Sequence, residues 1–325
     1  MPEVRRPILI PVLGKVKCMS EIPAEKGQLE SITDSKDAAG KRRLLAVLAH
    51  PDDESFGMGG TLARYAAEGV DVHIAIATDG VAGSVAGGYE YALKELAEVR
   101  RKELEAAVGV LGGKLHTLGY RDSGYIGDPA NQHPDAFINS DFHEATGKVV
   151  ALIRSIRPQV VVTHDETGGY YHPDHIHCWK ITKEAFEAAG DPSRYPEIGP
   201  APYQPARLYY TAFSNRMVKL FSFLMRLRGQ DPKRAGRNKD IDWTRIGIEP
   251  RRLNARINYR KYWDVKVAAG AEHPSQGGGP SRSRMIPEPI QKRFMATETF
   301  IRAYPPVPDG YREYDLFAGL NLDAS

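Results

Sequence analysis

Short apolar runs alternate with amphipathic segments through the middle of this 325-residue chain. The apolar runs have the length and composition of buried strands, and the segments between them repeat their apolar positions with a helical period. We predict strands at 44–49, 70–77, 114–118, 159–164 and 207–213, and helices near 57–68, 93–111, 142–156, 173–189 and 262–271. This alternation predicts an α/β fold with a doubly wound, mainly parallel sheet.

The two ends of the chain lack this alternation. Residues 1–40 mix charge, Pro and Gly without a sustained period, so we treat them as an N-terminal extension. Residues 41–325 are expected to form a single domain in which 214–325 is a C-terminal cap on the sheet. The Gly- and Ser-rich segment 276–284 is expected to be a mobile loop.

The charge balance gives no indication of a polyanionic partner. The chain has 44 basic and 41 acidic residues, and a net charge of +3 is too small to indicate nucleic acid or a membrane as the main partner. A basic stretch at 226–239 has three interpretations: a solvated face, which is the default, a rim for an acidic substrate, or a contact in a homo-oligomer. We therefore expect no nucleic acid and no membrane as partner.

Cysteine usage and hydropathy bear on the compartment. The only two cysteines, Cys18 and Cys178, do not suggest a disulfide framework. No apolar run approaches the roughly 18 residues that a membrane span needs, and residues 8–13 lack a convincing signal-peptide cleavage site. We expect a soluble, cytoplasmic protein.

Two short motifs rich in His and Asp each follow a predicted strand. His50-Pro51-Asp52-Asp53-Glu54 follows the first strand and His172-Pro173-Asp174-His175 follows the fourth. His50 and Asp53 can point to one side of a strand-to-helix turn, and His175 supplies a third ligand. Two imidazoles, one carboxylate and an open position for water are the composition of a catalytic zinc site, whereas a structural site usually has four protein ligands.

The other polar residues of these motifs suit the proton transfers of amide hydrolysis. Asp52 is the candidate base for an attacking water, because it must point differently from its neighbour Asp53. His172 is a candidate for stabilising the oxyanion or protonating the leaving amine, and Asp174 for orienting an imidazole. A lone His-Pro-Asp triplet is more often a structural cap, so the prediction depends on the two motifs meeting in the fold.

With these motifs in this order, the chain resembles the PIG-L/LmbE-like zinc deacetylases over residues 44–213. Within the family it is similar to mycothiol S-conjugate amidase and N-acetylglucosaminyl-inositol deacetylase, through segments 119–124 and 165–172, and 187–191 with 208–210 favours the amidase. The resemblance implies a Rossmann-like fold with strand order 3-2-1-4-5. The first and fourth strands are neighbours in that order, and the two motifs follow these strands.

The resemblance also implies roles for single residues. It matches the roles that spacing suggests, with His50, Asp53 and His175 as zinc ligands, Asp52 as general base and acid, and His172 as oxyanion stabiliser. It adds Tyr170 as a mobile tyrosine near the tetrahedral intermediate, and Arg100 and Asp122 as contacts to a sugar or inositol. For Arg100 the alternative is an ordinary solvated helix face.

We therefore predict a metal-dependent amidase or deacetylase that cleaves a linear N-acyl amide on a glucosamine-type sugar. The substrate is expected to be a small molecule such as a low-molecular-weight thiol precursor or its S-conjugate, and the cofactor one Zn²⁺ per chain, with Fe²⁺ as the alternative. Other hypotheses are a zinc deacylase of another glycan or antibiotic intermediate, and a binding protein in which metal only ties two loops. A nucleotide-binding module has little support, because Gly57-Met58-Gly59-Gly60 lacks the third glycine of the dinucleotide fingerprint.

Overall fold

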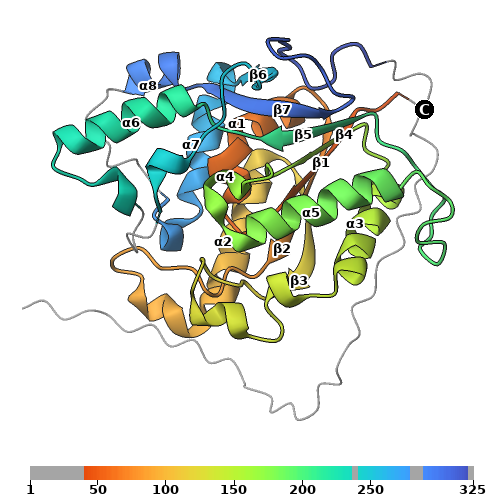
Figure 1. Cartoon of the computed structure of the whole chain (residues 1–325), viewed down its shortest axis with the longest axis horizontal. Helices are drawn as coiled ribbons and strands as arrows, with labels where there is room; N and C mark the ends of the chain where they lie inside the picture. Colours follow the sequence, from red (N-terminus) through yellow and green to blue (C-terminus); the bar gives the residue numbers. More distant parts are fainter. Residues whose placement is uncertain (1–39, 236–240, 279–287, 321–325) are drawn as a thin grey trace, which may run out of the picture. The chain divides into compact units, whose positions relative to one another are not determined.

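The computed structural model describes residues 40–235, 241–278 and 288–320 (Figure 1). Three predictions fall wholly or partly outside these residues. They are the N-terminal extension up to residue 39, residues Arg237 and Lys239 of the basic stretch, and 279–284 of the Gly- and Ser-rich loop.

One sheet organises the described part of the chain. Its strands follow the order β3-β2-β1-β4-β5-β7-β6. The first five are parallel in the predicted 3-2-1-4-5 order, whereas β7 is antiparallel to both β5 and β6. Their bounds are β1 Arg43–Leu48, β2 Asp71–Thr78, β3 Lys114–Tyr120, β4 Val160–Thr163, β5 Arg207–Thr211, β6 Ala255–Asn258 and β7 Thr297–Tyr304. The predicted doubly wound, mainly parallel α/β fold is confirmed.

Helices cover both faces of this sheet (Figure 1). Helices α3 and α5 pack together on one face, while α1, α2 and α7 pack together on the other. The helices are α1 Asp53–Ala67, α2 Leu96–Leu111, α3 Phe142–Ile156, α4 Gly168–Tyr171, α5 Pro173–Ala188, α6 Asn215–Leu227, α7 Trp263–Ala271 and α8 Glu288–Phe294. Within the described ranges, no helix combines the length and apolar character that crossing a membrane requires.

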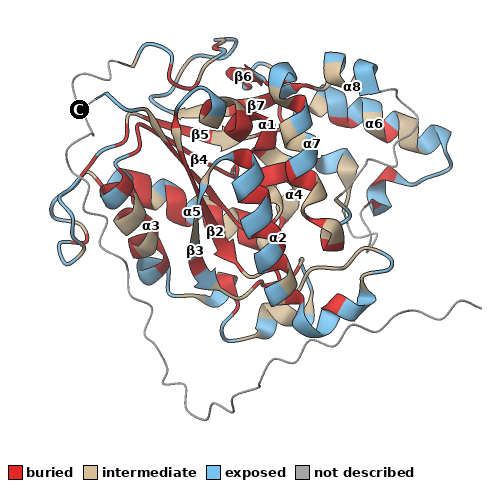
Figure 2. Cartoon of the chain, turned by 180° about the vertical axis from the view of Figure 1, so that it is seen from behind, coloured by how far each residue is buried: buried red, intermediate tan, exposed pale blue. Residues whose placement is uncertain are grey.

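Strand β1 shows why the sequence pattern identified the sheet. Side chains alternate across a strand, so Leu44, Ala46 and Leu48 pack into the core on the α1 and α2 face. Leu45 and Val47 pack into the core on the α3 and α5 face. A strand covered on both faces is apolar at every position, which is why β1 reads as an unbroken apolar run. Figure 2 shows the neighbouring strands β2 and β4 as buried segments between helices with exposed outer surfaces.

The region after residue 213 differs most from expectation. The pattern predicted one helix there, which is α7, but the structure also contains α6, α8, β6 and β7. Because β7 pairs with β5, this region extends the sheet as well as covering it. The pattern missed these strands because β6 has only four residues, β7 mixes buried with partly exposed residues, and β7 pairs with segments far away in the sequence.

Candidate metal and catalytic site

The two His- and Asp-rich motifs meet at the carboxyl ends of adjacent strands. Strand β1 pairs in parallel with β4, with Leu44 opposite Val160, so both chains leave the sheet at the same edge. The first motif leads from β1 into α1, and the second leads through α4 into α5. This is the position where the strand order reverses, and open α/β sheets bind their ligands there.

The three predicted metal ligands have converged. Nδ1 of His50 lies 3.0 Å from Nε2 of His175 and 3.7 Å from Oδ2 of Asp53. The His175 nitrogen lies 3.4 Å from the same Asp53 oxygen. Donors bound to one tetrahedral zinc at about 2.0–2.1 Å lie roughly 3.3 Å from each other. The three donors therefore have the chemistry and the separations that a single divalent cation needs.

Buried carboxylates orient His50. Its Nε2 lies 3.1 Å from Oδ2 of Asp174 and 3.5 Å from Oδ1 of Asp122. A proton held on Nε2 leaves the Nδ1 lone pair available for a metal, and Asp174 lies where it was predicted to orient an imidazole. Burial opposes a charged imidazole, but the carboxylates of Asp122 and Asp174 raise the pKa of His50 well above its usual value. The cluster thus favours a positive charge at its centre.

Asp53 is held as a charged ligand. Its Oδ2 accepts a hydrogen bond of 2.8 Å from the backbone N–H of His50. Burial alone would raise the pKa of Asp53, but His175, His164 and His50 lower it well below its usual value. The carboxylate therefore stays ionised among these rings.

His164 belongs to the site, although its spacing indicated no role. Its ring stacks on His175 with centroids 3.9 Å apart, and its Nε2 lies 3.5 Å from Oδ2 of Asp53. This Nε2 accepts the N–H of Ala49 at 3.0 Å, so its lone pair is already occupied. We infer that His164 supports His175 by packing. Its place directly after β4 was the signal that could have identified it.

Asp52 and Arg100 form a partly buried ion pair beside the ligands. Asp52 precedes α1 with φ 119°, an uncommon backbone conformation for a residue other than glycine. Arg100 of α2 is 3% exposed and donates from Nη2 to Oδ2 of Asp52 at 3.1 Å and to the carbonyl oxygen of Pro51. The solvated-face alternative for Arg100 is therefore wrong. Burial raises the pKa of Asp52 to about 6, although Arg100 acts to lower it.

The loop after β2 depends on glycine where it meets Arg100. The carbonyl oxygen of Gly80 accepts from Nη1 of Arg100 at 2.7 Å. Gly80 has φ +67°, and a Cβ placed there would lie 2.4 Å from Nη1. A larger residue at position 80 would displace the guanidinium that holds Asp52.

A second buried pair supports the same turn from the far end of the chain. Glu54 accepts the backbone N–H of Asp52 at 2.9 Å, and its other oxygen lies 2.7 Å from Nε2 of His273. Burial opposes a charged ring, but Glu54 raises the pKa of His273. No sequence spacing linked Glu54 with His273, because the residues are brought together only when α7 packs against α1.

His172 presents a hydrogen-bond donor toward the ligands. As the N-cap of α5, it accepts the backbone N–H of Asp174 on Nδ1 at 3.2 Å. The proton of the neutral ring therefore lies on Nε2. Burial lowers the pKa of His172 to about 3, so the ring is neutral. Its ring centroid is 4.5 Å from that of His50.

Tyr170 lies over the same group of rings. Its ring is 5.0 Å from His175 and 5.7 Å from His172, in edge-to-face contact with both. Tyr125 stacks on it at 6.1 Å and donates its hydroxyl to the Tyr170 carbonyl oxygen. Burial raises the pKa of Tyr170 well above its usual value, so the phenol keeps its proton.

A polar cavity of about 240 Å³ opens onto this cluster. Its lining includes the predicted catalytic and substrate-binding residues Asp52, Arg100, Asp122, Tyr170 and His172. Asp122 is 2% exposed and accepts backbone N–H groups from Ala82 and Gly124. Both residues predicted to contact a sugar or inositol therefore face this polar space.

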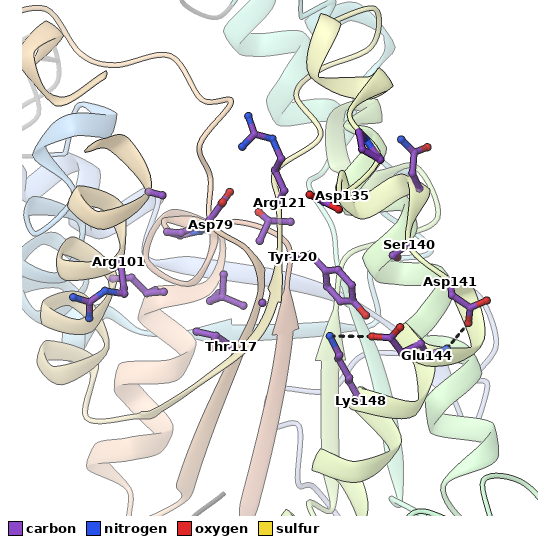
Figure 3. A pocket seen from close by; sticks show the side chains of 18 of the residues that line it. Asp79, Arg101, Thr117, Tyr120, Arg121, Asp135, Ser140, Asp141, Glu144 and Lys148 are labelled. Atoms are coloured by element: carbon purple, nitrogen blue, oxygen red, sulfur yellow. Dashed lines mark hydrogen bonds and ion pairs between the residues drawn. The ribbon is translucent and has the colours of Figure 1, made fainter. Parts of the chain in front are cut away.

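A larger cavity lies elsewhere (Figure 3). It has a volume of about 950 Å³ and is lined by residues such as Asp79, Arg101, Tyr120, Glu144 and Lys148. None of the predicted ligands or catalytic residues lines it. Size alone therefore does not locate the chemistry in this fold.

Comparison with known proteins identifies a matching family and relatives over most of the chain. The family model described as PIG-L: GlcNAc-PI de-N-acetylase matches residues 45–186. A mycothiol S-conjugate amidase of Streptomyces coelicolor is 38% identical over 291 residues, covering 87% of this chain and 98% of the relative. A 1D-myo-inositol 2-acetamido-2-deoxy-alpha-D-glucopyranoside deacetylase of Geodermatophilus obscurus is 36% identical, with 86% and 98% covered.

Solved structures show the same fold. The N,N'-diacetylchitobiose deacetylase from Pyrococcus horikoshii, solved with an inhibitor, aligns with a TM-score of 0.54 at 21% identity. The alignment covers 83% of this chain and 87% of that one.

Fold and site together define an α/β hydrolytic enzyme whose His and Asp side chains form a centre able to hold a metal ion. With relatives at these identities over most of its length, the chain belongs to the PIG-L family, and it is an amide-cleaving hydrolase.

Proposed function

We propose that this protein is a zinc-dependent N-deacylase acting on a glucosamine-type sugar within a small molecule, with a thiol precursor or its S-conjugate as the leading candidates. The observation that carries the proposal is the convergence of His50, Asp53 and His175 beside a polar cavity lined by Asp52 and His172. The relatives named as a mycothiol S-conjugate amidase and an inositol-linked glucosamine deacetylase support this choice of substrate.

We assign His50, Asp53 and His175 as the metal ligands. Two imidazoles and one carboxylate suit zinc, and the same donor set also suits ferrous iron. A bound zinc ion would supply a Lewis acid that polarises the acyl oxygen and a water molecule. The excess of buried carboxylates around His50 supports a cation at this position.

Asp52 is the proposed proton carrier. Arg100 fixes one carboxylate oxygen, and the described residues give the other oxygen no hydrogen bond, which leaves it to accept a proton from the attacking water. The protonated Asp52 can then return that proton to the departing amine nitrogen. Arg100 therefore positions the base in addition to lining the cavity.

His172 and Tyr170 are the proposed donors to the oxyanion. The N-cap hydrogen bond on Nδ1 fixes the neutral His172 tautomer with its proton on Nε2, so the Nε2–H group can act as a donor. Tyr170 retains its phenolic proton and lies beside His172. Arg100 and Asp122 are the proposed contacts to the sugar or its polyol, since both line the polar cavity.

A substrate panel tests this function. The metal-replete full chain is incubated with N-acetylglucosaminyl-inositol, N-acetylglucosaminyl-malate, a mycothiol S-conjugate and a chitooligosaccharide, and the released amines are identified by mass. We expect an amine from at least one sugar amide and none from the His175→Ala variant. Complete metal loading and substrate binding without hydrolysis of any amide would instead support a binding protein.

A further inference from the structure

A third cavity adjoins the polar cavity of about 240 Å³, and its lining is apolar. Its volume is about 460 Å³. Side chains from α1, α4, α6, β7 and the segment 241–246 line it, including Phe56, Tyr170, Phe213, Met217, Phe221 and Trp243. Ligand pockets for small molecules have this size and this aromatic, apolar character.

The apolar cavity lies next to the metal-ligand cluster and shares lining residues with the polar cavity. Tyr170 and Ile241 line both cavities. Tyr170 also contacts the rings of His172 and His175, and Phe56 lies in the first turn of α1, which Asp53 begins. The two cavities therefore meet at Tyr170, the residue that contacts the rings of His172 and His175.

Three polar side chains of the apolar cavity, Lys266, Glu298 and Thr299, are already paired. Lys266 forms an ion pair with Glu298, whose oxygens also accept the backbone N–H groups of Gly60 and Thr61. Thr299 donates its hydroxyl to the carbonyl oxygen of Ala212. Sugar hydroxyls placed there would lose water and gain few hydrogen bonds in return, which disfavours a sugar as occupant.

We propose that this cavity receives the acyl group of the substrate, and that this acyl group is apolar and larger than acetyl. The inference rests on the proposed function, because it assigns the sugar to the polar cavity and the acyl side of the same amide to the apolar one. An acetyl methyl has about the volume of one water molecule, which is roughly 30 Å³. A methyl would leave most of the cavity without a partner for its aromatic walls.

A chain-length series on one sugar tests the inference. N-acetyl-, N-butyryl-, N-hexanoyl- and N-octanoyl-glucosaminyl-inositol are hydrolysed by the zinc-loaded full chain, and kcat/KM is measured for each. We expect kcat/KM to rise roughly two- to fourfold for each methylene that enters the cavity. A rate that is highest for acetyl and falls with length overturns the inference but leaves the deacylase function intact. Absence of hydrolysis for every member, acetyl included, overturns the proposed function itself.

A pair of variants on one helix separates the cavity from general effects. Met217 lines the cavity, while Leu220, also exposed on α6, does not. Met217→Glu should flatten the chain-length dependence of kcat/KM, because it places a charged carboxylate in the apolar lining. Leu220→Glu should behave like the unmodified protein throughout. Equal flattening in both variants, or in neither, would contradict the assignment.

Binding of the product acid gives a measurement that does not depend on turnover. Octanoate and acetate are titrated into the zinc-loaded protein by calorimetry. We expect octanoate to bind at least about tenfold more tightly, with a negative heat-capacity change from apolar burial, and Met217→Glu to abolish that difference. Equal affinities for the two acids would overturn the inference.

Discussion

Replacing Asp174 by Asn should weaken metal binding with little change in shape. Asp174 is fully buried, and its Oδ2 lies 3.1 Å from Nε2 of His50 while also accepting the N–H of Ser123 at 2.9 Å. An Asn side chain can present an amide N–H to Nε2 of His50. That favours the tautomer with its proton on Nδ1, the nitrogen we assign to the metal.

The size of the effect follows from the role of such partners elsewhere. Loss of a carboxylate that orients a ligating histidine typically costs about 10- to 100-fold in metal affinity, which is about 1.4–2.7 kcal/mol. Asp122 is farther from Nε2, at 3.5 Å, so Asp122→Asn should cost less. The expected order of zinc affinity is the unmodified protein, then Asp122→Asn, then Asp174→Asn.

Competition with a chromophoric zinc chelator measures these affinities, and thermal unfolding of the metal-free proteins controls for damage to the fold. Asp315→Asn is a matched control outside the site, since Asp315 accepts from the Tyr65 hydroxyl and the Phe317 N–H. An Asp174→Asn protein that binds zinc like the unmodified protein would refute the reasoning about His50.

Three further predictions concern proton transfer, packing and the metal. The kcat/KM of the enzyme should rise with pH as Asp52 ionises, and the midpoint of this rise should lie at or below pH 6, because the bound cation lowers the pKa of Asp52 further from the value of about 6 that burial and Arg100 set together. Arg100→Met should move this midpoint to higher pH in a pH–rate profile. An unchanged midpoint would contradict the ion pair between Arg100 and Asp52. Gly60→Ala should lower the free energy of unfolding by about 1–3 kcal/mol in urea titrations, because a Cβ there would lie 2.2 Å from the Tyr259 ring. Gly57→Ala should be neutral or slightly stabilising, because a Cβ there would meet no atom of the described residues within 4 Å. Removing the metal with a chelator should abolish hydrolysis and lower the melting temperature. Zinc added at about 100 times its Kd should raise the free energy of unfolding by about 2.7 kcal/mol. Full activity in the metal-free protein would exclude a catalytic role for the metal.

The sequence predicted the parallel part of the sheet mainly because its inner strands β1, β2 and β4 are covered on both faces. Such strands read as apolar runs, and the helices between them have clear periods, as β1 and α3 show. The antiparallel strands β6 and β7 carry partly exposed residues and pair with segments distant in the sequence, so their local pattern was too weak to assign.

The same difference between local and long-range signals explains which residues of the site could be predicted from the sequence. His50, Asp53 and His175 could be proposed because each lies in a compact motif that follows a predicted strand. The support given by His164 to His175, and by His273 to Glu54, depends on tertiary packing that no spacing records. For Arg100, its place between Val99 and Arg101 on α2 did not show that it faces inward to Asp52.

The central claim is that Asp52 carries the proton at a metal centre built from the loops after β1 and β4. The most direct test measures release of the free amine per bound zinc for Asp52→Ala on N-acetylglucosaminyl-inositol, or on the best substrate of the panel, with metal content determined in the same sample. We expect one zinc per chain and a turnover reduced at least about 100-fold, consistent with loss of a general base. Near-normal turnover with full zinc would contradict the account.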